Sequence, residues 1–517
     1  MSPAVNKRKA RSDMAVSRRG FLSGAAWAGV AAAAGGCASR GGFLDFTDGS
    51  PMHGWAAPKI PHIRLGVIGL GGRGRGVVGR ACNLPGVTVT AICDNVPDKV
   101  AHVRKMLADK KKPAAREYLG DEEWRKVCED PNVDVVYNTT PWSLHVPVQL
   151  AAMRGGKHVF TEVPSAFTVD ECWELVETSE KTRRHCMQLE NCCYGEVEML
   201  TFNLAKLGML GEIVHGEGAY IHDLRHMCST EWPGAECWRF AENRDHGGNR
   251  YPTHGLVPLC LTMDINRGDR LDYLVSVDSN QVNFRAYMEA RLAADNPRRL
   301  SKVRMADMNS SLIKTAKGKS ILLQHDVSSP RPYSRIQLVT GTKGSICDYP
   351  FRVTFASKAG GECHNWFGYT LEEISRLLGR EVKSFYGLTR ADRARLEEEY
   401  AKQIAKKYRH PLWKTVGELA KRVGGHGGMD FIMDARWVYC LQQGLPLDMD
   451  VYDLAATCCL CELTETSADN KGRTCFVPDF TRGAWRTNKP LGIVDIDIGK
   501  MGIEDKKVGA AEGQMSV

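Results

Sequence analysis

From Ile63 onward, short runs of apolar residues alternate with longer segments in which apolar residues recur every three or four positions. The short runs indicate buried strands, and the periodic segments indicate amphipathic helices. One helical segment has Thr168 at its start and Glu171 three positions later, which is the pattern of a capping box. This alternation predicts a doubly wound parallel sheet over residues 61–190. Its expected strands are IRLGVIG, VTVTAICD, VDVVYNTTP, HVFTEVP and CMQLEN.

The pattern changes after residue 191. Runs such as LDYLVSVDS, SLIKTAKGKSILLQHDV and SRIQLVTGTKGSICDYP indicate antiparallel strands joined by tight turns. We therefore expect an α/β protein in which the parallel sheet is followed by an α+β domain, residues 191–495, with an open and mainly antiparallel sheet. Residues 368–407 are highly charged and helix-like, and they are interpreted as an insertion. Residues 496–517 are interpreted as a C-terminal tail, and the sequence contains no internal repeats.

The first 36 residues combine a basic start, the hexapeptide SRRGFL and a short run rich in Gly and Ala. This run is too short for a good transmembrane helix and is typical of the apolar part of a secretory signal. Paired arginines followed by Phe and Leu are typical of twin-arginine export, which moves folded proteins. We expect residues 1–36 to be a twin-arginine signal peptide, and the protein to be periplasmic or envelope-associated.

Cys37 follows the small residues AAGG, as in a lipoprotein cleavage box, but Ala34 stands where a larger aliphatic residue is usual. A lipid anchor at Cys37 and a simple cleaved or flexible segment are therefore both open. Residues 37–60 are rich in Gly, Ser and Pro and have no period, so they are interpreted as a linker.

Composition narrows the function classes. The formal net charge is +8, but six Lys and Arg residues against one Asp in the first 36 residues account for most of it, so nucleic acid is not expected as a partner. The 18 cysteines lie largely in apolar runs, as in TAICD and ATCCLCEL, where Cys acts as a small hydrophobic residue. The cysteine-rich stretches lack the paired spacing and histidines of zinc motifs. We predict mostly free thiols and no structural metal.

The stretch RLGVIGLGGRGRG contains a G-x-G-x-x-G motif formed by Gly69, Gly71 and Gly74. It follows a strand and opens a helix, and Asp94 ends the next strand, so a dinucleotide-binding Rossmann domain is predicted. Gly69 permits the tight turn, Gly71 lets the backbone approach a pyrophosphate, and Gly74 allows close packing of helix on strand. Asp94 can accept hydrogen bonds from ribose hydroxyls and would repel a 2′-phosphate, which favours NAD over NADP. The positive charge of Arg73 favours NADP instead.

Several longer blocks resemble a known family. The layout is similar to the Gfo/Idh/MocA oxidoreductases, but Glu162-Val163-Pro164 replaces their usual EKP, so the lysine at the reacting carbon is missing. Blocks from residue 58 to 495 resemble glycoside hydrolase family 109, the NAD-dependent α-N-acetylgalactosaminidases. They include TPWSLHVP, TEVPSAFTVDECW, GEGAYIHDLR, YPTHGL, QHDVSSPRPYSR, GGHGGMDF and PDFTRGAW.

The resemblance implies an unusual hydrolysis. Ordinary glycosidases use a carboxylate pair. In this family NAD transiently oxidises C3 of the sugar, after which the C2 proton is lost and the aglycone leaves C1. Water then adds, and NADH returns the hydride to the sugar. The cycle consumes no cofactor, so an exported enzyme need not be resupplied with NAD.

The resemblance also implies site residues. The cofactor contacts would be Gly72, Arg73, Asp94, Trp142, Ser143, Leu144, His145, Glu162, Val163 and Asn191. The substrate contacts would be Tyr220, Arg239, Tyr251, Pro252, Thr253, His254 and Tyr333. Tyr194 and His254 would be the catalytic pair, with their division between C2 and the C3 hydroxyl left open; His254 suits a base because its pKa can straddle neutrality. The glycine-rich GGHGGMD is interpreted as a tight helix entrance, with Asp430 in the first turn.

Two other functions are open. One is an NAD(P)-dependent sugar dehydrogenase or sugar oxidoreductase of the same superfamily, against which Val163 speaks. The other is a non-catalytic envelope sugar-binding protein, against which the retained Asp94, Tyr194 and His254 speak. We expect a glycoside with terminal N-acetylgalactosamine as substrate and a homo-oligomeric assembly. The sugar, the anomer and the number of subunits stay open.

Overall fold

The computed structural model describes residues 51–229, 231–232, 235–356 and 369–502. The expected signal peptide, Cys37 and the end of the expected tail lie outside these residues. Within them, no helix has the length and apolar character needed to cross a membrane.

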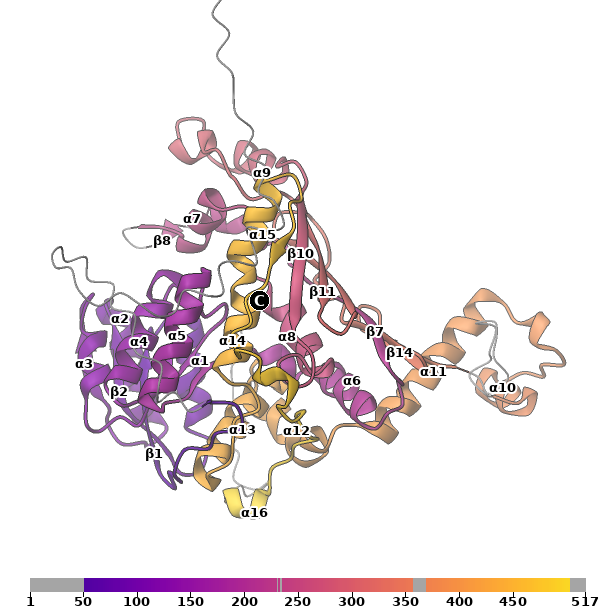
Figure 1. The fold of residues 1–517 in the computed structure, drawn as a ribbon, viewed down its shortest axis with the longest axis horizontal. Coiled ribbons are helices and arrows are strands. Elements are labelled where there is room, and N and C mark those ends of the chain that lie inside the picture. The colour runs from indigo at the N-terminus through magenta and orange to yellow at the C-terminus, as the bar shows by residue number, and fades with distance from the viewer. Residues whose placement is uncertain (1–50, 230, 233–234, 357–368, 503–517) are drawn as a thin grey trace, which may run out of the picture. The chain divides into compact units, whose positions relative to one another are not determined.

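The N-terminal domain contains a six-stranded sheet in the order β3-β2-β1-β4-β5-β6. All of its strand pairs are parallel, and helices connect them, which confirms the predicted doubly wound fold (Figure 1). The strands are β1 (Ile63–Ile68), β2 (Val87–Asp94), β3 (Arg116–Leu119), β4 (Val135–Asn138), β5 (His158–Thr161) and β6 (Cys186–Gln188). The helices are α1 (Gly72–Ala81), α2 (Pro97–Asp109), α3 (Trp124–Glu129), α4 (His145–Arg154) and α5 (Val169–Thr182).

The C-terminal domain contains an eight-stranded sheet in the order β15-β14-β13-β7-β12-β11-β10-β16. Its pairs are antiparallel except β7 with β12, so the predicted mainly antiparallel sheet is confirmed. Its strands are β7 (Ile213–Ile221), β10 (Leu271–Asp278), β11 (Asn309–Thr315), β12 (Ser320–Asp326), β13 (Leu338–Gly341), β14 (Gly344–Cys347), β15 (Arg352–Phe355) and β16 (Cys475–Phe476). A separate two-stranded ribbon is formed by β8 (Glu231–Trp232) and β9 (Ala235–Glu236).

The second domain also contains helices, most of which lie along this sheet or reach back to the first domain (Figure 1). They are α6 (Glu196–Lys206), α7 (Trp238–Asp245), α8 (Thr253–Thr262), α9 (Asn283–Arg291), α10 (Leu371–Leu378), α11 (Arg390–Tyr408), α12 (Pro411–Val423), α13 (Met429–Gln443), α14 (Val451–Cys458), α15 (Leu460–Asp469) and α16 (Ile498–Met501).

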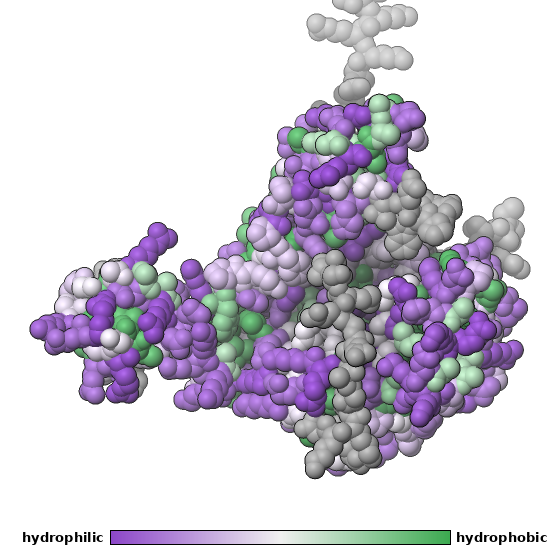
Figure 2. Space-filling model, turned by 180° about the vertical axis from the view of Figure 1, so that it is seen from behind, coloured by the Kyte–Doolittle hydropathy of each residue, from purple (hydrophilic) through white to green (hydrophobic). Residues whose placement is uncertain are grey.

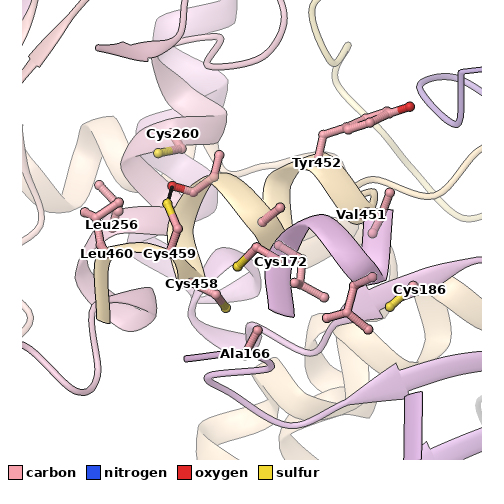
Figure 3. Packing of buried hydrophobic residues seen from close by; sticks show 14 of the residues in the cluster. Ala166, Cys172, Cys186, Leu256, Cys260, Val451, Tyr452, Cys458, Cys459 and Leu460 are labelled. Carbon is pink, nitrogen blue, oxygen red and sulfur yellow. Dashed lines mark hydrogen bonds between the residues drawn. The ribbon is translucent and has the colours of Figure 1, made fainter. Parts of the chain in front are cut away.

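Several cysteines lie in the core between the two domains. Cys172 on α5 faces Cys458 and Cys459, which lie at the end of α14. Cys260 on α8 lies on the other side of α14 (Figure 3). All sixteen cysteines among the described residues are free, and most are buried, which confirms the prediction of free thiols. Burial raises the pKa of Cys172, so its thiol stays protonated and packs as an apolar group.

The predicted segment boundaries differ from the structure at two places. The second half of the expected linker is packed, since Met52 is 3% exposed and its amide donates to the Tyr452 hydroxyl. The start of the expected tail is also packed, through buried Ile496 and Met501. The charged insertion forms α10 and α11, which project from the rest of the domain (Figure 1) and show an apolar patch ringed by polar side chains (Figure 2). Ile374, Val382, Leu388 and Leu396 form a small buried core beneath it, against which the partly buried Tyr369, Leu371, Leu377, Leu378 and Phe385 pack.

Candidate active site

The glycine-rich loop has the geometry that a dinucleotide requires. Gly69 adopts φ +87°, and a side chain at Gly74 would lie 1.9 Å from the Gly69 carbonyl oxygen, so α1 packs directly on β1. A Cβ at Gly71 or Gly72 would meet nothing within 4 Å. No side chain caps the N-terminus of α1, so its amides are free for phosphate oxygens. These residues fit the pyrophosphate of a dinucleotide.

Asp94 is at the carboxyl end of β2 and is 8% exposed. Its carboxylate accepts the Leu70 amide at 2.7 Å and the Val96 amide at 2.9 Å, and Lys99 Nζ lies 3.4 Å away. The acid therefore fixes the glycine-rich loop against β2, in the position where a ribose-binding acid is expected.

Arg73 joins the cofactor loop to two other predicted site residues and to the second domain. Its Nε donates to Glu162 at 2.7 Å, and its Nη1 donates to Asp430 at 2.6 Å. Asn191 also donates to Asp430, at 2.6 Å. Burial raises the pKa of Glu162, although Arg73 acts to lower it. At Asp430 burial also acts to raise the pKa, but Arg73, His426 and Arg80 outweigh it, and the pKa lies well below its ordinary value. Asp430 begins α13 after the glycine turn as expected, but it also holds the cofactor loop and Asn191 together.

The segment Trp142 to His145 follows β4 as a single turn of 3₁₀ helix that leads into α4. His145 is 1% exposed, and its ring nitrogens lie 2.7 Å from the Pro164 carbonyl oxygen and 3.0 Å from the Thr140 carbonyl oxygen. Burial lowers its pKa to about 4. Because both nitrogens face backbone carbonyls, the His145 side chain holds this turn in place and leaves no ring nitrogen for a cofactor. Ser143 is exposed and Leu144 is half-buried.

Three of the predicted substrate contacts, Tyr220, Tyr251 and Arg239, form one group with the predicted cofactor contact Trp142, here named the aromatic cluster. The Tyr220 and Tyr251 rings stack with centroids 4.4 Å apart, and the Arg239 guanidinium lies 4.9 Å from the Tyr251 centroid and 5.4 Å from that of Trp142. Arg239 Nη2 donates to the Tyr220 hydroxyl at 3.2 Å, and within the described residues no ion pair joins Arg239 to a carboxylate. Its remaining N–H groups can therefore serve a sugar oxygen or an acetamido carbonyl. Val163 packs in the same buried group and is 4% exposed.

Tyr333 forms the rim of this cluster. It is 37% exposed, and its ring meets the Tyr220 ring edge-on at 6.4 Å. His222, which the sequence reading did not single out, lies between them and has its Nδ1 2.9 Å from the Tyr220 hydroxyl. Burial, with Arg239 nearby, lowers the pKa of His222 to about 4, so this ring is neutral at physiological pH.

His254 lies at the start of α8, beside the aromatic cluster. Its Nδ1 is 2.7 Å from Glu190 Oε1, and its ring meets the Tyr251 ring edge-on at 4.8 Å. Glu190 is fully buried, two residues beyond the end of β6. Burial alone would raise the pKa of Glu190, but His254, the Thr253 side chain and the Cys192 amide more than offset it, so the net direction is down. An ionised carboxylate at Nδ1 keeps the proton there and leaves Nε2 as an acceptor.

Two glycines bring His254 and Tyr220 together. A Cβ on Gly218 of β7 would lie 2.2 Å from the Gly255 carbonyl oxygen, and a Cβ on Gly255 of α8 would lie 2.4 Å from the Ala219 amide nitrogen. The backbones of strand and helix can therefore touch at this point. The adjacent residues, Tyr220 and His254, have ring centroids 5.3 Å apart as a result. Pro252 precedes α8, and Thr253 is fully buried in its first turn.

The structure does not bring Tyr194 to this cluster. Its hydroxyl donates to Asp448 at 3.0 Å, and Asp448 also accepts from Arg436. Burial and then Asp448 raise the pKa of Tyr194 well above its ordinary value, which is the wrong direction for a base. Among the described residues, none of its hydrogen bonds or ring contacts reaches Tyr220 or His254. The predicted catalytic role of Tyr194 is therefore not supported, and Tyr220 is the phenol beside His254.

Like His222, Glu190 and Asp430 lie in the site although the sequence analysis did not assign them to it. Glu190 could have been found, because it directly follows a strand of the parallel sheet, where ligand-contacting residues gather. Asp430 gave no such signal, since its partners Arg73 and Asn191 lie more than two hundred positions earlier.

The fold and the site together define an NAD-binding protein of the Gfo/Idh/MocA type, with a second domain that closes the site. Residues 63–189 match the family model described as Oxidoreductase family, NAD-binding Rossmann fold. Residues 194–373 and 387–487 match Glycosyl hydrolase 109, C-terminal domain, so the chain belongs to glycosyl hydrolase family 109. NAD is its cofactor. The gap in the second match, 374–386, falls in the projecting α10–α11 region.

Curated relatives agree with this assignment. Glycosyl hydrolase family 109 protein 1 of Bacteroides fragilis is 44% identical over 437 residues, which are 84% of this chain and 89% of the relative. The Shewanella amazonensis protein of the same family is 40% identical over 483 residues, 93% of this chain and 99% of the relative.

Solved structures agree with the fold. An NAD binding oxidoreductase from Klebsiella pneumoniae has a TM-score of 0.58 at 17% identity, covering 81% of this chain and all of its own. A levoglucosan dehydrogenase in complex with NADH and levoglucosan has a TM-score of 0.54 at 16% identity, with the same coverage. At these identities the likeness concerns the fold alone.

Proposed function

We propose that this protein is an NAD-dependent glycosidase that removes a terminal N-acetylhexosamine, with α-linked N-acetylgalactosamine as the expected substrate. The observation that carries the proposal is the Glu190–His254 pair at the carboxyl edge of the nucleotide-binding sheet, which faces stacked tyrosines and an arginine that has no carboxylate partner among the described residues. When bound, NAD supplies reversible oxidation at C3 of the sugar.

The chain's own residues then have distinct tasks. Glu190 holds the proton on His254 Nδ1, so Nε2 can take the C2 proton of a sugar oxidised at C3. Burial raises the pKa of Tyr220, even with Arg239 beside it, so its hydroxyl stays protonated and acts as a hydrogen-bond donor. Arg239 offers further donors to the acetamido carbonyl or a sugar hydroxyl. Val163 gives the site no ammonium group, unlike the lysine of ordinary dehydrogenases in the superfamily.

The substrate is tested with the purified NAD-loaded protein and a panel of p-nitrophenyl α- and β-hexosaminides and hexosides. Release of p-nitrophenol from the α-N-acetylgalactosaminide, dependent on NAD but without net NADH, supports the proposal. Turnover in deuterated water should place deuterium at C2 of the released sugar. Stoichiometric NADH without cleavage would instead indicate a sugar dehydrogenase. Cleavage that survives removal of NAD would point to a carboxylate pair, and sugar binding without turnover to a binding protein.

A further inference from the structure

Glu190, Cys192 and His254 bring three metal-binding atoms to one place. A carboxylate oxygen, the thiol sulfur and an imidazole nitrogen all lie within 4.8 Å of one another. Glu190 and Cys192 are fully buried beyond the end of β6, and the His254 side chain is 13% exposed at the start of α8. The interpretation of the cysteines from their spacing did not detect this set, because His254 lies more than sixty positions away from the other two.

A second observation at the same place points to a ligand. Glu190 Oε1 accepts from His254 at 2.7 Å and from the Cys192 amide at 3.1 Å. Its other oxygen, Oε2, is buried and has no partner in hydrogen-bond geometry, although the Thr253 hydroxyl is close enough to help lower the pKa of Glu190. A buried carboxylate oxygen without a partner is unfavourable, and a cation is a partner that would satisfy it.

The donor set selects the kind of cation. Thiolate, imidazole and carboxylate together suit Zn²⁺ and similar thiophilic divalent ions rather than Mg²⁺ or Ca²⁺. With metal–ligand bonds of about 2.0–2.3 Å, donor atoms of a tetrahedral site are roughly 3.5 Å apart, so a contraction of about 1 Å would close the site. Burial raises the pKa of the Cys192 thiol, so a cation would have to displace its proton, after which Glu190 and Cys192 would together balance a divalent charge. The nearby Arg335 opposes a cation weakly, because Glu198 accepts two hydrogen bonds from its guanidinium.

We propose that Glu190, Cys192 and His254 form an inhibitory site for a thiophilic divalent cation such as Zn²⁺. The inhibitory effect rests on the proposed function, because the cation would use the imidazole and carboxylate that the reaction needs as a free base pair. The cation would therefore compete with proton transfer rather than assist it. Binding itself does not depend on the identity of the sugar.

The binding arm uses the full-length NAD-loaded protein and Co²⁺ as a spectroscopic probe, since cobalt–thiolate bonds absorb in the near ultraviolet. The wild type should bind roughly one Co²⁺ per chain at the site with a thiolate band. Cys192→Ala should lose the band, and Cys193→Ala, the matched change at the neighbouring buried cysteine, should keep it. Cys192→Ser serves if the alanine variant does not fold, as judged by its melting temperature and NAD content. Absence of the band from the wild type, or its persistence without Cys192, overturns the site.

The inhibition arm measures glycoside cleavage against Zn²⁺ concentration, relative to each protein's own rate in a chelator. Zn²⁺ should inhibit the wild type and the Cys193→Ala protein, and the chelator should restore the rate. Cys192→Ala should need at least about tenfold more Zn²⁺, because even the loss of a residue that only orients a metal ligand costs about 10- to 100-fold in affinity. Binding of Co²⁺ at Cys192 with no inhibition, or with activation, overturns the inhibitory role. A protein that cleaves no glycoside contradicts the proposed function, and the cobalt band alone then decides whether the site exists.

Discussion

The Glu190 carboxylate and the His254 ring share a hydrogen bond of 2.7 Å inside a fully buried environment. Glu190→Gln keeps the size of the side chain but removes the charge that fixes the imidazole tautomer and stabilises the imidazolium. We expect kcat to fall by about 10- to 100-fold, the usual effect of losing a group that orients a catalytic histidine, with KM little changed. Steady-state kinetics on the p-nitrophenyl substrate measures this. A variant that retains NAD and stays within twofold of wild-type kcat would exclude this role of Glu190.

The roles of Tyr220 and Tyr194 can be distinguished by removing the hydroxyl group of each one in turn. Tyr220→Phe removes the hydroxyl that Arg239 and His222 contact, and kcat should fall by about a hundredfold or more. Tyr194→Phe removes a hydrogen bond to buried Asp448, so it should lower the free energy of unfolding by about 1–3 kcal/mol and change kcat little. Kinetics and urea denaturation of both variants test the assignment. The reverse pattern would restore Tyr194 as the catalytic tyrosine.

His145 should make stability depend on pH. Burial lowers its folded-state pKa to about 4 from 6.5, so between these values the unfolded chain binds a proton that the folded chain does not. Its contribution is fully present above pH 6.5 and is lost as pH falls toward 4, by up to about 3 kcal/mol. In His145→Gln the free energy of unfolding should fall less steeply over this range. Urea denaturation at a series of pH values measures the slopes, and parallel curves for the two proteins would contradict the prediction.

At the scale of the elements, the contact of β7 with α8 sets the distance between Tyr220 and His254. Gly255→Ala would place a Cβ 2.4 Å from the Ala219 amide nitrogen, so the helix must move off the strand. We expect kcat and the melting temperature to fall together. Gly79→Ala on α1 is the matched control, because its Cβ meets nothing within 4 Å and alanine favours a helix by about 0.5–1 kcal/mol. A Gly255→Ala protein as active and stable as this control would show that the close contact is not needed.

Elements governed by local pattern could be predicted from the sequence. The strand VTVTAICD is β2 over the same residues, and the Thr168–Glu171 capping box starts α5 as expected. The sequence analysis missed β3, because only Tyr118 of its four side chains is buried, and it also missed the short α3 that follows. In the site, the glycine-rich loop follows from a local motif. The pairings Glu190–His254, Arg73–Asp430 and Tyr194–Asp448 join residues 64 to 357 positions apart, and only the fold reveals them.

At the scale of the whole molecule, the predicted cofactor site is fixed by hydrogen bonds that require both domains to be folded. Arg73 on the glycine-rich loop and Asn191 beyond β6 both bond Asp430 at the start of α13. A chain exported unfolded would have to assemble this site and find NAD outside the cytoplasm. The sequence SRRGFL near the start predicts instead a route that carries folded proteins.

We therefore expect the protein to cross the membrane with NAD already bound. Changing Arg18 and Arg19 together to Lys keeps the charge of the segment but removes the arginine pair, so the protein should stay in the cytoplasm, folded and loaded. Changing Arg8 and Arg11 to Lys is the matched control and should leave export intact. Cell fractionation followed by measurement of NAD released from the purified protein gives both results. Export that persists without the arginine pair, or an exported protein that contains no NAD, would break the link between the folded cofactor site and the route, because a chain that crosses unfolded cannot carry a cofactor held by residues from two domains.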